Sequence, residues 1–162
     1  MEETVSEFSV ALDPGNPRSN DDWEIRFGFL LHDCARLRRI LIDETFKPLN
    51  VTRSQAWLLA YLSRRDGSTQ SELADQMNLG KVAVGGLVDR LEASGMIERR
   101  AHPSDRRVNN IFLTEKGRKV VTQIRKLTLD ANKDMLKGLS MKDLKTVVSV
   151  MQTFKRNLQA LQ

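Results

Sequence analysis

Apolar residues recur every three or four positions between residues 23 and 46, and this spacing predicts a long helix. The segment has one main apolar stripe and a second apolar line roughly opposite to it. The main stripe consists of Phe27, Leu30, Leu31, Cys34, Leu37 and Leu41, and the second line of Ile25, Phe29 and Ile40. A surface helix of a monomer needs only one apolar stripe. Two stripes therefore predict a helix that is buried on both sides, either centrally or against another subunit.

Shorter helical patterns follow, each with its own start and stop signals. Thr52 to Gln55 has the capping-box pattern that opens a helix over residues 53–65, and Thr69 to Glu72 opens a second, shorter helix in the same way. The tight turn Asn78-Leu79-Gly80 leads into a helix over residues 81–93, and Gly95 ends it. Two short helices joined by a turn that contains glycine predict a helix-turn-helix, a motif that also occurs in proteins that never touch DNA.

A basic hairpin is predicted directly after these helices. Residues 96–100 and 110–113 alternate as strands do, and the polar segment 101–107 between them is typical of a hairpin tip. Within the hairpin only Glu98 and Asp105 oppose four arginines, which are Arg99, Arg100, Arg106 and Arg107. A hairpin in this position is a wing. The predicted fold is therefore mainly α with a small β wing, and two further helices, capped by Thr114 and Ser140, complete it.

The charge is distributed unevenly along the chain. The 162 residues carry a net charge of +5, but residues 1–22 alone carry −5, so the remaining 140 residues carry +10. The first 22 residues are rich in turn formers and are interpreted as a flexible acidic arm. A basic body favours a polyanionic partner, although composition does not choose between nucleic acid and a membrane surface.

Several classes of protein are disfavoured by composition. No apolar run approaches the roughly 18 residues that span a bilayer, and residues 1–12 lack the basic residues of a secretory signal. One cysteine and two histidines cannot form an ordinary zinc site from Cys and His alone. No nucleophile–base pair, carboxylate dyad or phosphate loop is visible. We therefore expect a cytoplasmic protein that is not an enzyme and has no metal and no cofactor.

Three segments resemble the MarR family of bacterial transcription regulators. They are residues 41–52, residues 87–99 with the sequence LVDRLEASGMIER, and Ser104-Asp105-Arg106-Arg107 followed by FLTEKG at 112–117. The resemblance covers about residues 23–160. It implies a homodimer in which residues 23–50 and 115–162 form a helical dimerisation region and residues 51–114 form a winged helix-turn-helix. It also implies that helix 81–93 enters the major groove, and the wing tip the minor groove, of a roughly palindromic operator on double-stranded DNA.

The expected DNA contacts lie at two helix starts, on one helix face and on the wing. A helix N-terminus with hydroxyl groups suits a phosphate, the start of helix 81–93 suits a phosphate or a base, and arginines suit a narrow minor groove. The family further implies that Asp105 holds a wing arginine in position. The predicted contact residues are Ser68, Thr69, Gln70, Lys81, Val82, Gly85, Gly86, Arg90, Asp105, Arg106 and Arg107.

Gly85 and Gly86 depart from the family pattern, because several relatives carry a polar residue and an arginine at these positions. Two glycines inside a helix cost about 1 kcal/mol each relative to alanine. Two explanations remain open. Either helix 81–93 packs closely against its neighbour, or its backbone approaches the DNA closely and leaves few side chains for direct readout of bases.

Family members are commonly repressors that are released by an aromatic or phenolic effector bound between the two regions. By resemblance, an effector such as an aromatic acid, a phenolic compound or a thioester would bind between helices 23–46 and 53–65. The predicted pocket residues are Phe27, Leu31, His32, Arg36, Trp57, Leu58 and Tyr61. A core or dimer-interface role for these side chains is the competing interpretation.

Two alternative functions remain. One branch of the family senses hydroperoxides through a cysteine, but Cys34 lies on the main apolar stripe, where we expect a buried thiol of low reactivity. The second alternative is an architectural DNA-binding protein that responds to no ligand.

Overall fold

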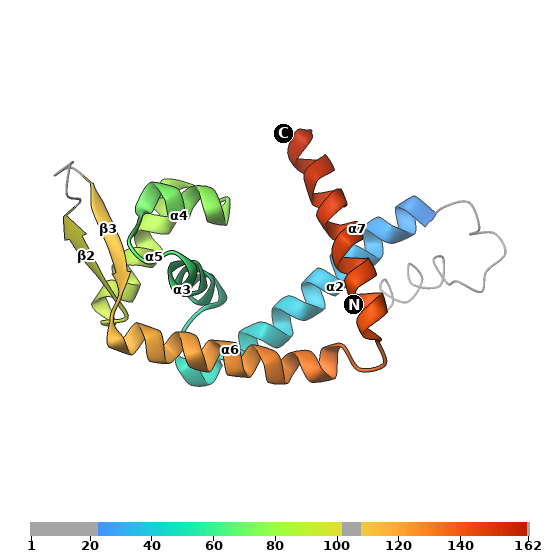
Figure 1. Ribbon diagram of the computed structural model, residues 1–162, viewed down its shortest axis with the longest axis horizontal. Coiled ribbons are helices and arrows are strands. Elements are labelled where there is room, and N and C mark those ends of the chain that lie inside the picture. Colours follow the sequence, from blue (N-terminus) through green and yellow to red (C-terminus); the bar gives the residue numbers. More distant parts are fainter. Residues whose placement is uncertain (1–22, 102–107, 162) are drawn as a thin grey trace, which may run out of the picture. The chain divides into compact units, whose positions relative to one another are not determined.

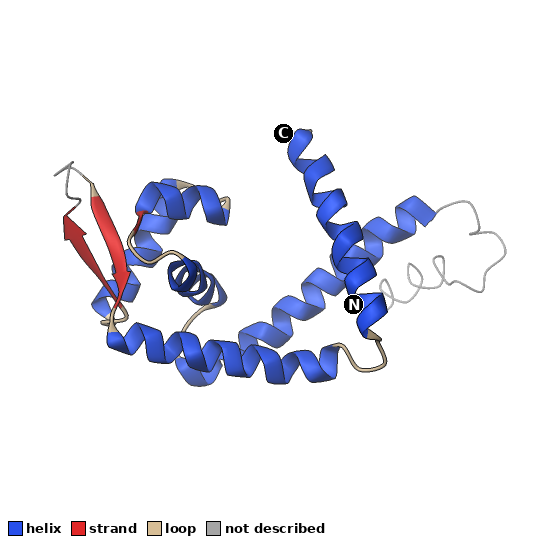
Figure 2. Cartoon of the chain, in the orientation of Figure 1, coloured by secondary structure: helices blue, strands red, loops and turns tan. Residues whose placement is uncertain are grey.

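A computed structural model describes residues 23–101 and 108–161 of the chain, and these residues are mostly helical with one small antiparallel sheet (Figures 1 and 2). The predicted fold class is confirmed. The elements in chain order are α2 (Trp23–Phe46), the 3-10 helix η2 (Lys47–Leu49), α3 (Arg53–Arg64), β1 (Ser68–Thr69), α4 (Gln70–Met77), α5 (Lys81–Ala93), β2 (Ile97–Ala101), β3 (Asn109–Leu113), α6 (Glu115–Met135) and α7 (Met141–Ala160).

The chain divides into two compact units, residues 1–55 and 56–162. In the first unit, α2 ends at Phe46 and continues as one 3-10 turn that contains Pro48. Asn50 closes this turn in the left-handed conformation, with φ at 52°, and its backbone N–H donates to the carbonyl oxygen of Lys47. Short polar residues such as asparagine tolerate this conformation best. The turn therefore sets the direction in which the chain leaves α2.

The core of the second unit is a winged helix. In Figure 1 the hairpin of β2 and β3 stands beside α5 and α4. The expected inner faces of the helices are buried, since Leu73 of α4 and Val84, Val88 and Leu91 of α5 have no exposed surface. The spacing of apolar residues therefore predicted which face of each helix enters the core.

The three-stranded sheet has the order β1-β3-β2, and both neighbouring pairs are antiparallel. The hairpin pairs Ile97 with Leu113 and Ala101 with Asn109. The pattern of residues did not predict β1, which pairs Ser68 with Ile111. A strand of two residues is too short to show alternation, and what forms β1 is its pairing with β3, more than 40 residues away in sequence.

Three contacts attach the start of α6 to the winged helix. The Lys116 ammonium donates to the carbonyl oxygen of Ser94 (2.7 Å), and the backbone N–H of Thr114 donates to the carbonyl oxygen of Met96 (3.1 Å). Arg118 forms an ion pair with Asp66 (2.7 Å). Thr114 caps α6 as predicted, because its side chain accepts from the N–H of Gly117. The first turn of α6 is therefore held against the β2–β3 hairpin.

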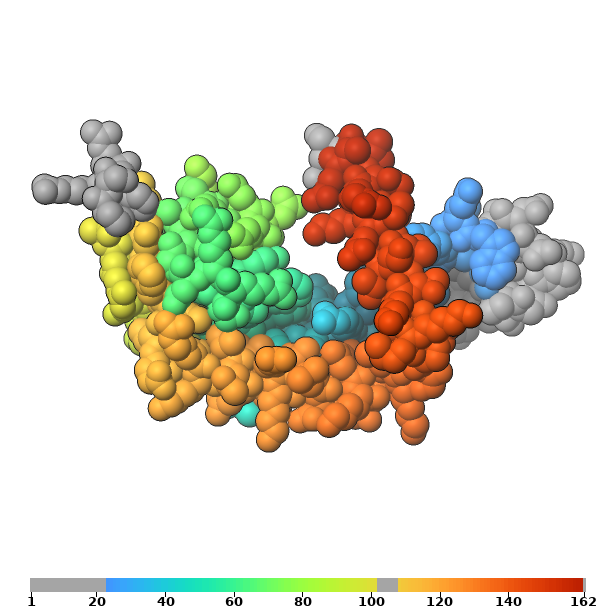
Figure 3. All heavy atoms as spheres, in the orientation of Figure 1, coloured from blue at the N-terminus to red at the C-terminus, as the bar shows by residue number. Residues whose placement is uncertain are grey.

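Two helices have apolar residues that the chain itself does not cover. Only Ile42 and Phe46 of the 24 residues of α2 are buried, and none of the 20 residues of α7 is buried. In Figure 3, side chains of α7, drawn in red, stand at the surface. Of the two alternatives predicted for α2, burial on both sides within the chain is wrong, because most residues of both apolar lines are exposed. Burial against another subunit stays a prediction.

Cys34 is exposed, so the expectation of a buried thiol is also wrong for the single chain. The residues of α2 that the chain buries are Ile42 and Phe46, at the C-terminal end of the helix. Neither belongs to the stripe that contains Cys34.

Candidate nucleic-acid interface

The start of α4 is built by a capping box. Thr69 accepts a hydrogen bond on its hydroxyl from the N–H of Glu72 (3.2 Å), and the Thr69 N–H donates to the Glu72 carboxylate (2.8 Å). Ser68 is only 1% exposed, and its hydroxyl donates to the carbonyl oxygen of Arg65 (2.9 Å). The expectation that Ser68 offers its hydroxyl to a phosphate is therefore corrected, because this hydroxyl is used inside the fold.

Gln70 connects α4 to α5. Its side-chain amide Nε2 donates to the carbonyl oxygen of Lys81, at the first residue of α5, over 3.1 Å. The same nitrogen lies 3.1 Å from the position that a Cβ at Gly85 would occupy. Such a contact is tighter than ordinary van der Waals packing, so a side chain at position 85 would push against Gln70. For Gly85, this geometry supports close packing between the helices.

Gly86 has a different neighbour, the side chain of Arg90 one turn further along α5. The two terminal nitrogens of the Arg90 guanidinium lie 3.6 and 4.0 Å from the position of a Cβ at Gly86. Both residues lie on the side of α5 away from the core, as does Val82, which is 91% exposed. The outward face of α5 therefore has an exposed apolar side chain at Val82, a glycine at position 86 and an arginine at position 90.

Arg99 links β2 to the C-terminal half of α5. Its guanidinium forms ion pairs with Asp89 (2.5 Å) and with Glu92, and its backbone N–H donates to the Glu92 carboxylate (3.1 Å). The hydrogen bond with Asp89, together with the charge of both carboxylates, raises the pKa of Arg99 although partial burial opposes this. Arg99 therefore connects β2 of the wing to α5.

Arg100 is also engaged within the wing. It forms an ion pair with Glu98, and its guanidinium carbon lies 4.5 Å from the centre of the Phe112 ring, in cation–π geometry. The sequence interpretation counted only Glu98 and Asp105 against the four wing arginines. It missed Asp89 and Glu92, which lie ten and seven positions before Arg99, because this pairing depends on how β2 returns along α5.

The predicted contacts at the wing tip, Asp105, Arg106 and Arg107, lie outside the described residues. The sequence alone shows that little of the positive charge belongs to the winged helix. Residues 51–114 contain nine Lys and Arg against seven Asp and Glu, whereas residues 115–161 contain eleven against four. Attraction of a polyanion at long range would therefore come largely from α6 and α7 rather than from the wing.

The predicted effector residues fall into both units of the chain. On α2, Phe27, His32 and Arg36 are exposed and Leu31 is half-buried; Arg36 pairs with Asp33 over 3.4 Å. On α3, Trp57 is 48% exposed and Tyr61 is half-buried, with their ring centres 6.2 Å apart. Leu58 has no exposed surface, so its expected role as a pocket residue is corrected to that of a core residue.

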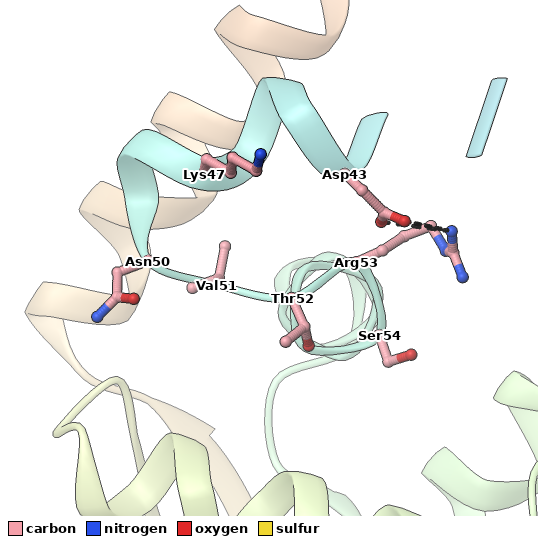
Figure 4. A pocket seen from close by; sticks show the side chains of 7 residues that line it. All are labelled: Asp43, Lys47, Asn50, Val51, Thr52, Arg53 and Ser54. Carbon is pink, nitrogen blue, oxygen red and sulfur yellow. Dashed lines mark hydrogen bonds and ion pairs between the residues drawn. The ribbon is translucent and has the colours of Figure 1, made fainter. Parts of the chain in front are cut away.

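A pocket of about 480 Å³ lies at the junction of α2, η2 and α3 (Figure 4), and none of the predicted effector residues lines it. It is lined by Asp43, Lys47, Asn50, Val51, Thr52, Arg53 and Ser54. Both cations at this pocket are already paired, Lys47 with Glu44 (2.6 Å) and Arg53 with Asp43 (3.2 Å). The N-terminus of α3 is capped by Thr52, which accepts from the N–H of Gln55 (3.3 Å). The sequence signal that could have located this pocket is the turn formed by Pro48 and Asn50.

In residues 23–101 and 108–161, no group of three or more His, Cys, Asp or Glu side chains could hold a metal ion. No helix in these same ranges is both long enough and apolar enough to cross a membrane.

Comparison with known proteins agrees with this geometry. Residues 49–108, which contain the helix-turn-helix and most of the wing, match the sequence model of the MarR family. MarR from E. coli, solved as a cysteine-to-serine mutant in complex with operator DNA, is 25% identical. It matches with a TM-score of 0.74 over 80% of this chain and 94% of its own.

Two further solved structures share the fold. The transcriptional regulator SlyA is 25% identical, with a TM-score of 0.73 over 80% of this chain and 93% of its own. A MarR transcriptional regulator from Methanosarcina mazei Go1 is 24% identical, with a TM-score of 0.73 over 83% of this chain and 97% of its own. Residues 49–108 of this chain therefore contain a winged helix-turn-helix that matches the MarR family, and over four fifths of the chain the fold is shared with MarR-family transcriptional regulators.

Proposed function

We propose that this regulator is a homodimeric repressor that binds a palindromic operator on double-stranded DNA and is released by a small aromatic or phenolic effector. The observation that carries the proposal is the two-sided construction of α5. Its inner face is fully buried, and its outer face presents an exposed Val82 together with Lys81 and Arg90, beside the hairpin of a winged helix. The related MarR from E. coli was solved in complex with operator DNA.

In this proposal α5 enters the major groove and the wing reaches the neighbouring minor groove. Phosphate contacts would come from the start of α4 and from Lys81, and base contacts from the outer face of α5. Ser68 is left out because its hydroxyl is used inside the fold. The proposed contact residues are Thr69, Gln70, Lys81, Val82, Gly85, Gly86, Arg90, Asp105, Arg106 and Arg107.

We propose that the uncovered apolar residues of α2 and α7 form the dimer interface, with residues 23–50 and 115–162 as the dimerisation region. Contiguous apolar surface of this kind is rare on monomeric proteins and marks an interface. On α7, Val147, Val148 and Val150 are each 54% exposed, and on α2, Leu30 is 65% and Leu37 is 56% exposed. A two-fold dimer would also place two copies of α5 at half-sites about one turn of DNA apart.

DNA binding is tested by selecting operators from fragmented genomic DNA and measuring affinity by fluorescence anisotropy at several salt concentrations. We expect a few palindromic sites, a mass of two chains in light scattering, and affinity that falls steeply with salt as phosphate contacts release counterions. Replacing Arg106 and Arg107 together with alanine should weaken binding. Unchanged affinity in this double variant would refute the wing assignment. Protection spread evenly over the DNA would instead support the architectural alternative.

The proposed effector would bind beside the aromatic pair Trp57 and Tyr61 of α3, which offers a stacking surface. A thermal-shift screen with aromatic acids, phenolics and their coenzyme A thioesters tests this part. A compound that stabilises the protein and also releases the operator would support an effector-responsive repressor. If no compound acts, and mild peroxide releases DNA from the natural protein but not from Cys34→Ser, the redox alternative replaces the effector. We expect no catalytic activity from this regulator.

A further inference from the structure

Arg90 is placed in the C-terminal half of α5, yet its guanidinium lies over Gly86, at the middle of the helix. Long side chains on a helix lean back toward its N-terminus and cover the preceding turn. A side chain at position 86 would compete with Arg90 for this surface. Because residue 86 is glycine, the guanidinium rests at 3.6 Å from the position of a Cβ there, which is ordinary van der Waals distance.

Arg90 forms no ion pair with the acidic residues near it on α5. The nearest acidic residues along α5 are Asp89 and Glu92, and both are held by Arg99. Among the described residues, no carboxylate lies within ion-pair distance of Arg90. The exposed guanidinium of Arg90 can therefore contact a ligand.

The position of α5 itself is fixed from the other side. Gln70 occupies the space above Gly85 and holds the carbonyl oxygen of Lys81 by a hydrogen bond of 3.1 Å. A bulky residue at position 85 would separate α5 from α4. Gly85 thus leaves room for the side chain of Gln70 from α4, and Gly86 leaves room for the side chain of Arg90 from α5 itself.

In a helix that lies in the major groove, the residues nearest its N-terminus contact the edges of bases. From position 90 an arginine that pointed straight outward would reach toward the backbone of the DNA. We propose that Gly86 redirects Arg90, so that its guanidinium reads a guanine from the place that a side chain at position 86 would otherwise occupy. This inference rests on the proposed DNA-binding function and assigns Arg90 as a specificity-determining residue.

The operator should contain the bases that suit Arg90 and Val82. The planar guanidinium pairs with O6 and N7 of guanine through two hydrogen bonds, and an apolar side chain suits a thymine methyl group. Val82, 91% exposed, lies one turn before Gly86, about 6 Å along the helix axis. We therefore expect each half-site to contain a guanine with a thymine no more than two or three base pairs away.

The test combines operator selection from a random DNA pool with binding titrations on the selected operator and on unrelated DNA. Arg90→Ala should weaken binding to the selected operator by about 10- to 100-fold, bind unrelated DNA almost unchanged, and lose the preference for guanine. Gly86→Leu should have the same effect although Arg90 is intact, because its side chain fills the guanidinium position. Gly86→Ala adds only a Cβ at ordinary contact distance from Arg90, so it should lose less of the guanine preference than Gly86→Leu.

Two results would overturn the proposal. If Arg90→Ala weakens binding equally on all sequences and lowers the salt slope by about one, Arg90 contacts a phosphate rather than a base. If Gly86→Leu folds normally and selects the same operator as the natural protein, Gly86 does not direct Arg90. A natural protein that itself shows no sequence preference would instead refute the proposed function, so the two failures are distinguishable.

Discussion

Among the glycines that the structure describes, Gly117 has the least room for an added carbon atom. It lies in the first turn of α6, is buried, and faces the start of β2. A Cβ at this position would lie 2.0 Å from the carbonyl oxygen of Met96 and 3.2 Å from a methyl group of Leu113. Since a carbonyl oxygen and a carbon atom do not approach this closely, either the helix or the strand must move by more than 1 Å.

The magnitude for Gly117→Ala follows from three contributions. Overpacking costs about 2 kcal/mol. Moving the Met96 carbonyl disturbs its hydrogen bond from the N–H of Thr114 (3.1 Å), which costs about 1 kcal/mol. The better helix propensity of alanine returns about 1 kcal/mol. We therefore expect Gly117→Ala to lower the free energy of unfolding by about 2 kcal/mol.

The assay is thermal unfolding followed by circular dichroism at constant protein concentration, where this loss lowers Tm by about 4–8 °C. Gly86→Ala is the control, because it makes the same chemical change inside a helix but meets only the end of Arg90 at 3.6 Å. It should raise stability by about 1 kcal/mol through helix propensity. If both variants change stability in the same direction, steric contact at Gly117 is not what opposes the substitution.

Three further predictions concern the links between elements. Arg99→Ala should lower the free energy of unfolding by about 1 kcal/mol, since it removes partly exposed ion pairs between β2 and α5. Chemical denaturation measures this loss, and an unchanged denaturation midpoint would show that these ion pairs do not stabilise the fold. Asp66→Ala should cost about 1–2 kcal/mol because the carboxylate accepts from the N–H of Leu113 (2.8 Å) and from Arg118, whereas Asp66→Asn should retain part of this stability. The pKa of Asp143 is lowered from its ordinary value of 3.8 by hydrogen bonds from the side chain and backbone of Ser140, so this cap stabilises α7 above that pH and is lost as the pH falls through the lowered pKa. Ser140→Ala should move the Asp143 pKa back toward its ordinary value in an NMR titration, and an unmoved titration curve would show that the cap is absent.

The sequence by itself determined the features that depend on near neighbours along the chain. The capping box at Thr69 and the cap at Ser140 were readable because a cap acts on residues two or three positions further on, whatever the rest of the chain does. The inner face of α5 was readable for the same reason, because residues three and four apart share one side of a helix. The family motifs lie in these same local segments.

The tertiary structure decided which distant groups meet. The strand β1 exists only because Ser68 reaches Ile111, and Gly117 is restricted only because the backbone of Met96 passes beside it. The two open explanations for Gly85 and Gly86 also needed the fold, since Gln70 lies fifteen positions before Gly85. No periodicity encodes such contacts, because they depend on the path of the chain through its turns.

For the apolar stripes of α2, neither the sequence nor the fold of the single chain identifies what covers them. The spacing predicted a buried helix, and the single chain leaves that helix exposed, including Cys34. An apolar stripe specifies that a surface is to be removed from water, but it does not specify whether the same chain or a second copy covers it. The sequence thus determined which apolar residues share one side of a helix, and only the folded chain decided which of them are covered by the rest of the chain, because burial within one chain is limited by what its own turns can bring together.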